Sequence, residues 1–154
     1  MLIILTSILL VSCKKGYKVD NFTYKFSIEN IGNFNSRFQL NPDKSYDIIQ
    51  TNIYFDKFEG VQRPSGKSGI LTEEEFIKIK NLIEDADLNK MKDSYGFDND
   101  ESDNLTNIIY NIEISSNDLN KFVTINMTPD QKFTSSFINL IEYTNELIDN
   151  KISD

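Results

Sequence analysis

The sequence contains no histidine and a single cysteine, Cys13. Enzymes of the Ser-His-Asp and Cys-His types are therefore excluded, because both need a histidine base. Zinc and haem sites with histidine or cysteine ligands are also excluded, because the chain has no histidine and its one thiol is expected to carry lipid. The chemistry that remains is that of carboxylates, tyrosine or a Ser-Lys pair. One cysteine also allows no disulfide within the chain, so the packing of the core has to supply the stability.

Arginine is scarce as well, since Arg37 and Arg63 are its only occurrences, and the formal net charge is -8. Nucleic-acid-binding surfaces need clustered Lys and Arg to oppose phosphates, so no nucleic-acid partner is expected. A phosphate-binding loop is also missing, because the glycines between residues 60 and 69 lie in a stretch of turn composition. A nucleotide-dependent enzyme is therefore not expected.

An apolar run that begins at Met1 ends in Ser12 and Cys13, which is the form of a bacterial lipobox. About a dozen apolar residues are too few to span a bilayer, but they match the apolar part of a signal peptide. We predict that residues 1–12 are a lipoprotein signal peptide, that Cys13 is lipidated, and that residues 13–21 contain this cysteine and a tether. The alternatives are an ordinary signal peptide with a bystander cysteine, or a buried N-terminal strand.

The destination of such a protein follows from the residues after the cysteine. Lys14 stands there, with no acidic retention signal, and similarity to known lipoprotein sorting then implies the outer membrane. We expect a monomer that is anchored to the membrane by its lipid and faces the periplasm, with the cell surface left open as an alternative. An acidic surface attracts anionic lipid headgroups little, so the acyl chains must supply the membrane affinity.

Residues 22–152 are long enough for one hydrophobic core and too short for two, so they are expected to form a single domain. Alternation of apolar and polar residues predicts strands at residues 22–28, 34–40, 46–55, 107–114 and 121–127. The last of these strands places Ile125 and Met127 inward. Residues 58–61 extend the third strand or form an edge, residues 60–69 are expected to be a loop, and residues 87–106 a polar connection.

Two helices are predicted from their start signals. Thr72 and Glu75 form a capping box, which predicts a helix over residues 73–86. Pro129 occupies the first helical position after Thr128, which predicts a second helix that extends to about residue 148. The side chains expected to pack on the sheet are Phe76, Ile79 and Ile83 of the first helix and Phe137, Leu140 and Ile141 of the second.

The element order βββ-α-ββ-α, with short turns between consecutive strands, predicts an α+β fold. We expect a two-layer sandwich in which a mostly antiparallel sheet of about five strands carries two helices on one face.

Three segments, residues 69–76, 82–87 and 92–100, resemble an uncharacterised domain family that is common in short bacterial lipoproteins. That family couples the pattern G-x-L-[ST]-x-E-E-[FL] at a helix start to D-S-Y and acidic residues, followed by two strands and a closing helix. The resemblance implies a fold and a lipid anchor, and it implies no activity or catalytic residue. Many members carry Cys-Phe-Gly-x-Cys-Pro where this chain has residues 33–36 without cysteine, so a redox role does not carry over.

An acidic segment supplies the candidate metal ligands Asp93, Asp98, Asp100 and Asp103. Carboxylate oxygens at short spacing are what Ca²⁺ requires, but the EF-hand pattern fails because Asp103 replaces the glycine of that loop. We interpret the segment as a solvated acidic loop, with a calcium site as the alternative.

Three aromatic residues, Tyr54, Phe58 and Tyr95, are candidates for binding a partner. Tyr54 and Phe58 lie where aromatic and charged residues are interleaved, a composition that suits a sugar or a partner protein. In an alternating strand half of these side chains belong to the core, and that is the interpretation we favour. The ring of Tyr95 can likewise pack beneath its loop with the hydroxyl bonded.

These features together predict a membrane-anchored extracytoplasmic lipoprotein that acts as a non-catalytic binding or interaction module, with an envelope protein or a glycan as partner. One alternative is a carboxylate-based hydrolase, although acidic residues are too plentiful for a catalytic pair to be chosen. The other is a calcium-stabilised structural domain.

Overall fold

The computed structural model describes residues 18–30, 32–52, 64–97, 108–117, 119–129 and 131–153. The strands in these residues are β1 (Thr23–Asn30), β2 (Phe34–Leu40), β3 (Ser45–Asn52), β4 (Ser65–Ile70), β5 (Ser94–Tyr95), β6 (Ile108–Ser115) and β7 (Asn120–Asn126). The helices are α2 (Glu73–Ala86), α3 (Ser135–Ser153) and a short 3-10 helix at Leu88–Lys90.

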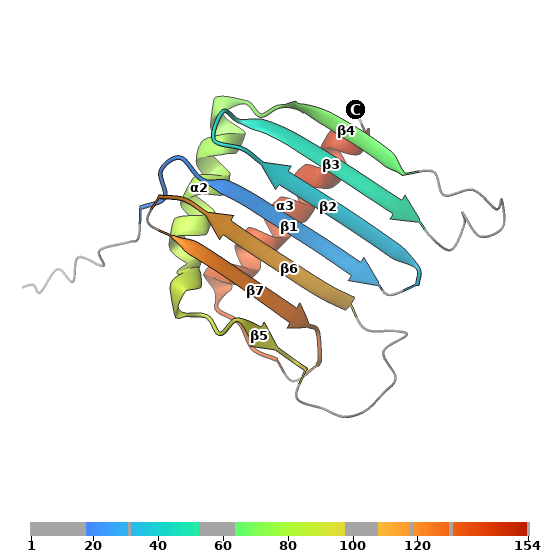
Figure 1. Cartoon of the computed structure of the whole chain (residues 1–154), viewed down its shortest axis with the longest axis vertical. Coiled ribbons are helices and arrows are strands. Elements are labelled where there is room, and N and C mark those ends of the chain that lie inside the picture. The colour runs from blue at the N-terminus through green and yellow to red at the C-terminus, as the bar shows by residue number, and fades with distance from the viewer. Residues whose placement is uncertain are drawn as a thin grey trace, which may run out of the picture.

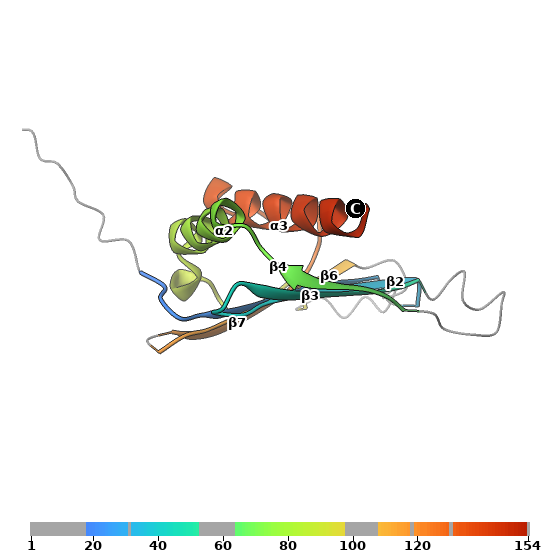
Figure 2. The same cartoon turned by 90° about the horizontal axis from the view of Figure 1, so that it is seen from above.

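The strands form one mixed, mostly antiparallel sheet in the order β4-β3-β2-β1-β6-β7-β5 (Figure 1). Helices α2 and α3 pack together and lie on the same side of this sheet (Figure 2). The predicted α+β class is therefore confirmed. The predicted count of about five strands is wrong, because the described residues form seven.

The core lies between the sheet and the two helices. Pairing across five neighbouring strands aligns one row of side chains on the helix side, and each of them is at most 1% exposed. The row consists of Ile48, Phe38, Phe26, Ile112 and Val123. Because successive residues of a strand point to opposite faces, the rows on either side of it face away from the helices.

Helix α2 begins as its sequence predicts. The amide of Glu75 donates to the Thr72 hydroxyl at 3.2 Å, and the Glu75 carboxylate accepts from the Thr72 amide at 2.9 Å. Asp87 ends the helix in the left-handed conformation, with φ of 48°. Ile79 and Ile83 are buried as predicted, and Phe76 is partly buried and stacks on a neighbouring ring.

Helix α3 begins later than its sequence predicts, at Ser135 instead of Pro129. Pro129 does not start the helix: the amide of Gln131 donates to the carbonyl of Thr128 at 3.2 Å, and the Gln131 side chain donates to the backbone carbonyl of Asn126 at 2.8 Å, at the end of β7. Thr134 then accepts from the amide of Phe137 and caps the helix. Phe137 and Leu140 are buried as predicted, while Ile141 is only partly buried.

Residues 65–70 form the edge strand β4, so the prediction of a loop there is wrong. The glycines that suggest turns serve the pairing instead. Gly69 lies opposite Tyr46, and a Cβ atom at this position would come within 2.9 Å of the tyrosine hydroxyl. A side chain larger than hydrogen would displace the Tyr46 ring from its place over β4.

Strand β5 is also unpredicted, because it lies within the expected polar connection and pairs in parallel with β7. A hydrogen bond from the amide of Thr124 to the carbonyl of Asp93, at 2.9 Å, holds the backbone just ahead of β5 against β7. Gly96 then turns the chain with φ of 76°, where a Cβ atom would come within 2.1 Å of the backbone oxygen of Asn126. The strand therefore depends on a glycine and on a distant partner.

Candidate functional site

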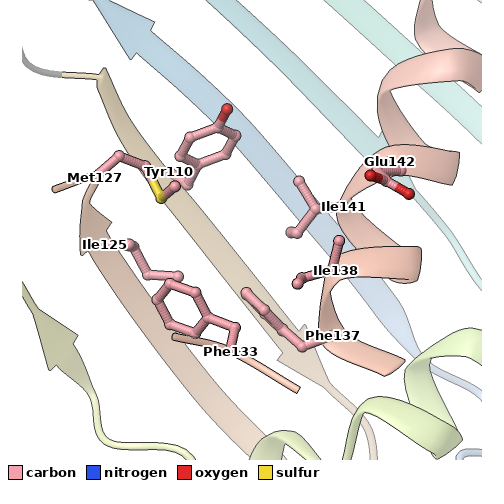
Figure 3. Close-up of a pocket in the computed structure, with 8 residues that line it drawn as sticks. All are labelled: Tyr110, Ile125, Met127, Phe133, Phe137, Ile138, Ile141 and Glu142. Atoms are coloured by element: carbon pink, nitrogen blue, oxygen red, sulfur yellow. The ribbon is translucent and has the colours of Figure 1, made fainter. Parts of the chain in front are cut away.

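An apolar pocket of about 120 Å³ lies between helix α3 and strands β6 and β7 (Figure 3). The residues that line it are Tyr110, Ile125 and Met127 of the sheet side, Phe133 ahead of the helix, and Phe137, Ile138, Ile141 and Glu142 of α3.

Local geometry explains why these side chains meet. Tyr110 and Ile125 are opposite one another in the pairing of β6 with β7, so both project toward the helix layer. Ile141 and Glu142 each lie one turn after Ile138 on α3, and residues three or four positions apart are neighbours on the surface of a helix. Figure 3 shows Ile138 and Ile141 facing the sheet residues across the pocket.

A chain of aromatic rings supports the pocket wall. Phe133 lies 5.2 Å from Phe137 and 5.3 Å from Tyr95, between ring centroids. The amide of Lys92 donates to the Tyr95 hydroxyl at 2.9 Å. The structure therefore places Tyr95 behind the pocket, beneath its loop and with its hydroxyl bonded, where it holds Phe133 without lining the cavity.

The rim of the pocket is open, and two of the lining residues, Tyr110 and Glu142, have polar side chains. Met127 is 43% exposed and Ile138 is 42% exposed, so helix α3 leaves both in contact with solvent. Burial raises the pKa of the half-buried Tyr110, so its hydroxyl stays neutral at physiological pH. Within the described residues, neither the Tyr110 hydroxyl nor the Glu142 carboxylate has a hydrogen-bond or ion-pair partner.

Of the four candidate metal ligands, Asp93 is the one that lies in the part of the chain that the structure describes. Asp93 pairs with Lys121 at 2.5 Å, and Lys121 also donates to the carbonyl of Met91 at 2.6 Å. This arrangement fastens the segment ahead of β5 to β7. The described ranges contain no cluster of three or more metal-ligating side chains.

Several predicted residues lie outside the described residues. They are Cys13, Tyr54, Phe58, Asp98, Asp100 and Asp103.

The open face of the sheet, which the helices leave uncovered, is a second surface to consider. One row of it runs across Asp47, Gln39, Lys25, Glu113 and Phe122. Lys25 pairs with Glu113 at 3.0 Å, and Asp47 accepts from a serine hydroxyl of β4 at 2.5 Å. Much of the polar surface is therefore satisfied internally, as expected for a sheet face in contact with water.

Sequence reasoning missed the pocket because its lining residues look like ordinary core. Tyr110 and Met127 fit the alternation of their strands, and Phe137 fits the helical stripe. A weak signal was available in Ile138, which widens the apolar face of α3 beyond the predicted stripe.

No protein-family model matches the chain, and no curated protein matches it significantly. The resemblance to the lipoprotein domain family over residues 69–103 stays a prediction. Among the described residues, no helix is both long enough and apolar enough to cross a membrane.

Proposed function

We propose that this chain is an extracytoplasmic, lipid-anchored binding module whose pocket between α3 and the sheet receives an apolar side chain of a partner protein. The observation that carries the proposal is the preformed pocket itself. Its walls are apolar, and Met127 and Ile138 are left partly exposed at its rim. Exposed apolar side chains around a cavity are typical of interaction sites.

The size of the pocket favours a single side chain over a whole small molecule. Sites for small molecules usually enclose about 300–1,000 Å³, whereas an apolar cavity of about 150 Å³ accepts one benzene molecule. At about 120 Å³, this pocket matches the end of a leucine or phenylalanine side chain. One buried anchor of this kind often dominates the affinity of a protein interface.

The apolar walls also favour a protein partner over a glycan. Burying sugar hydroxyls without hydrogen-bond partners is costly, and Tyr110 and Glu142 are the polar side chains among the described lining residues. The partner that we propose is therefore another protein of the cell envelope.

The same residues support a non-catalytic role. Hydrolysis of a glycosidic bond needs two carboxyl groups about 5–9.5 Å apart. Among the described residues that line the pocket, Glu142 alone carries a carboxylate.

Membrane attachment belongs to the proposal through the lipobox that ends in Cys13. Lys14 follows it with no acidic retention signal, which supports the outer membrane and a periplasm-facing domain. Attachment near a membrane raises the local concentration of envelope partners, so a modest pocket suffices for function.

A neutral probe with a leucine-like end, 3-methylbutan-1-ol, tests the pocket. Titration into the full mature chain should shift the methyl NMR signals of Ile125, Met127 and Ile141 saturably, because the isobutyl group displaces water from their surfaces. Ile138→Asn should weaken this binding, since it places an amide at the rim.

The matched control is Ile77→Asn, because Ile77 is 45% exposed on α2 and does not line this pocket. Unchanged methyl signals up to the solubility limit of the alcohol would refute the proposed site. Equal weakening by the two substitutions would also refute it.

A further inference from the structure

The charge at the mouth of the pocket is negative and unneutralised. Glu142 lines the pocket next to Ile141, and its carboxylate has no partner among the described residues. Glu75 of the neighbouring helix differs, since it pairs with Lys151 at 2.8 Å. Lys78, which reaches across the contact between the helices, lies over the ring of Tyr143 at 4.0 Å.

The surroundings of Glu142 reinforce its charge. Helices α2 and α3 together carry eight acidic residues and three lysines, and the whole chain has a net charge of -8. A negative potential of this kind raises the local concentration of cations and repels anions. A ligand that enters the pocket meets this field at its mouth.

Tyr110, on the sheet side, is the second lining residue with a polar group. The Tyr110 hydroxyl has no hydrogen-bond partner among the described residues, and a neutral phenol oxygen accepts hydrogen bonds from ammonium or guanidinium groups. The lining thus combines apolar walls with one acidic residue, Glu142, from the helix side and one tyrosine, Tyr110, from the sheet side (Figure 3).

Building on the proposed function, we infer that the pocket selects an apolar side chain flanked by positive charge, as in a partner segment where Leu or Phe adjoins Lys or Arg. The apolar side chain fills the cavity, and the adjacent cation pairs with Glu142 at the exposed mouth. An exposed pair contributes little affinity but discriminates against acidic segments, which the same carboxylate repels.

Three probes that share one isobutyl group test this inference: 3-methylbutylammonium, 3-methylbutan-1-ol and 3-methylbutanoate. We expect them to bind in this order, with the ammonium about threefold tighter than the alcohol at low salt, as for an exposed ion pair. About 0.5 M NaCl should remove most of this difference, because it shortens the screening length.

Glu142→Gln should bring the ratio of ammonium to alcohol affinity close to one. The control is Glu146→Gln, which removes the same charge one helical turn away, outside the residues that line the pocket, and should keep the ratio. Equal affinities of the three probes, or a ratio that survives Glu142→Gln, would overturn the inference. If 3-methylbutan-1-ol left the methyl NMR signals of the pocket residues unchanged, the proposed function itself would be overturned.

Discussion

Tyr24 and Thr144 form a buried polar pair that ties the central strand β1 to helix α3. Both residues are 0% exposed, and their oxygens lie 3.1 Å apart. The Thr144 hydroxyl donates its one proton to the carbonyl of Leu140 at 2.8 Å. The Tyr24 hydroxyl is therefore the donor in the pair. Burial raises the pKa of Tyr24 far above its ordinary value, so this donor keeps its proton at any physiological pH.

Replacing the acceptor of this pair should cost more than replacing the donor. Thr144→Val leaves the buried Tyr24 hydroxyl without an acceptor and should lower the free energy of unfolding by about 1–3 kcal/mol. Tyr24→Phe leaves no buried donor without an acceptor, so it should lower the free energy of unfolding by only about 0.5–1.5 kcal/mol. Urea unfolding followed by circular dichroism measures both changes. The double variant should be no less stable than Thr144→Val alone, and a loss equal to the sum of the two single losses would contradict the pairing.

At the scale of elements, Glu75 joins the start of α2 to the end of α3. One of its carboxylate oxygens serves the capping box with Thr72, and the other pairs with Lys151. Partial burial acts to raise the pKa of the Glu75 carboxyl, but the bonds from Lys151 and Thr72 outweigh it and hold the pKa below its ordinary value of 4.5.

This lowered pKa predicts how stability depends on pH. The charged Glu75 carboxylate contributes fully to the free energy of unfolding above the unfolded pKa of 4.5. This contribution is lost as the pH falls through the lower pKa of the folded state. When the pH is lowered from about 6 to about 3, the free energy of unfolding of Glu75→Gln should therefore fall by less than that of the unsubstituted chain. Glutamine still completes the capping box, so the comparison isolates the charge.

Glu74→Gln is the control for this experiment, because it removes a charge from the same helical turn without touching Lys151. Urea titrations at both pH values give the measurement. The ion pair between the helices would be without effect if the Glu75 and Glu74 variants showed the same pH dependence.

At the scale of the whole molecule, the sheet has one face covered by helices and one face open (Figure 2). The proposed pocket opens at the helix layer. Val19, within the predicted tether of residues 13–21, is 0% exposed and belongs to the core, so the part of the tether ahead of it would join the domain to the membrane. Domain and anchor are separable in this arrangement, because the described core begins at Val19 and Phe22.

Cys13→Ser removes the thiol that would accept diacylglycerol, so the variant should not be processed as a lipoprotein. We expect the unsubstituted protein to incorporate labelled acyl chains and to sediment with the outer membrane, and the variant to do neither. Fractionation with acyl labelling makes the measurement, and thermal melting of both proteins checks that the domain is unaffected. An unsubstituted protein that carries no acyl label and is as soluble as the variant would rule out the anchor.

What the sequence by itself determined is the set of elements whose signals are local. Alternation along Phe22 to Ile28 and along residues 34–40 predicts β1 and β2, because in each strand alternate side chains turn toward the core. The capping box at Thr72 predicts the start of α2 correctly, because Thr72 and Glu75 satisfy each other's amides within one turn.

What only the tertiary structure decided depends on partners that are distant in the chain. Strand β4 exists because β3 pairs with it and because Gly69 makes room for Tyr46. Strand β5 needs β7, and α3 starts at Ser135 because Gln131 bonds back to the end of β7. The pocket is the space that remains between α3 and strands β6 and β7 after packing. No local pattern encodes such a space, because its shape depends on how two separately formed surfaces meet.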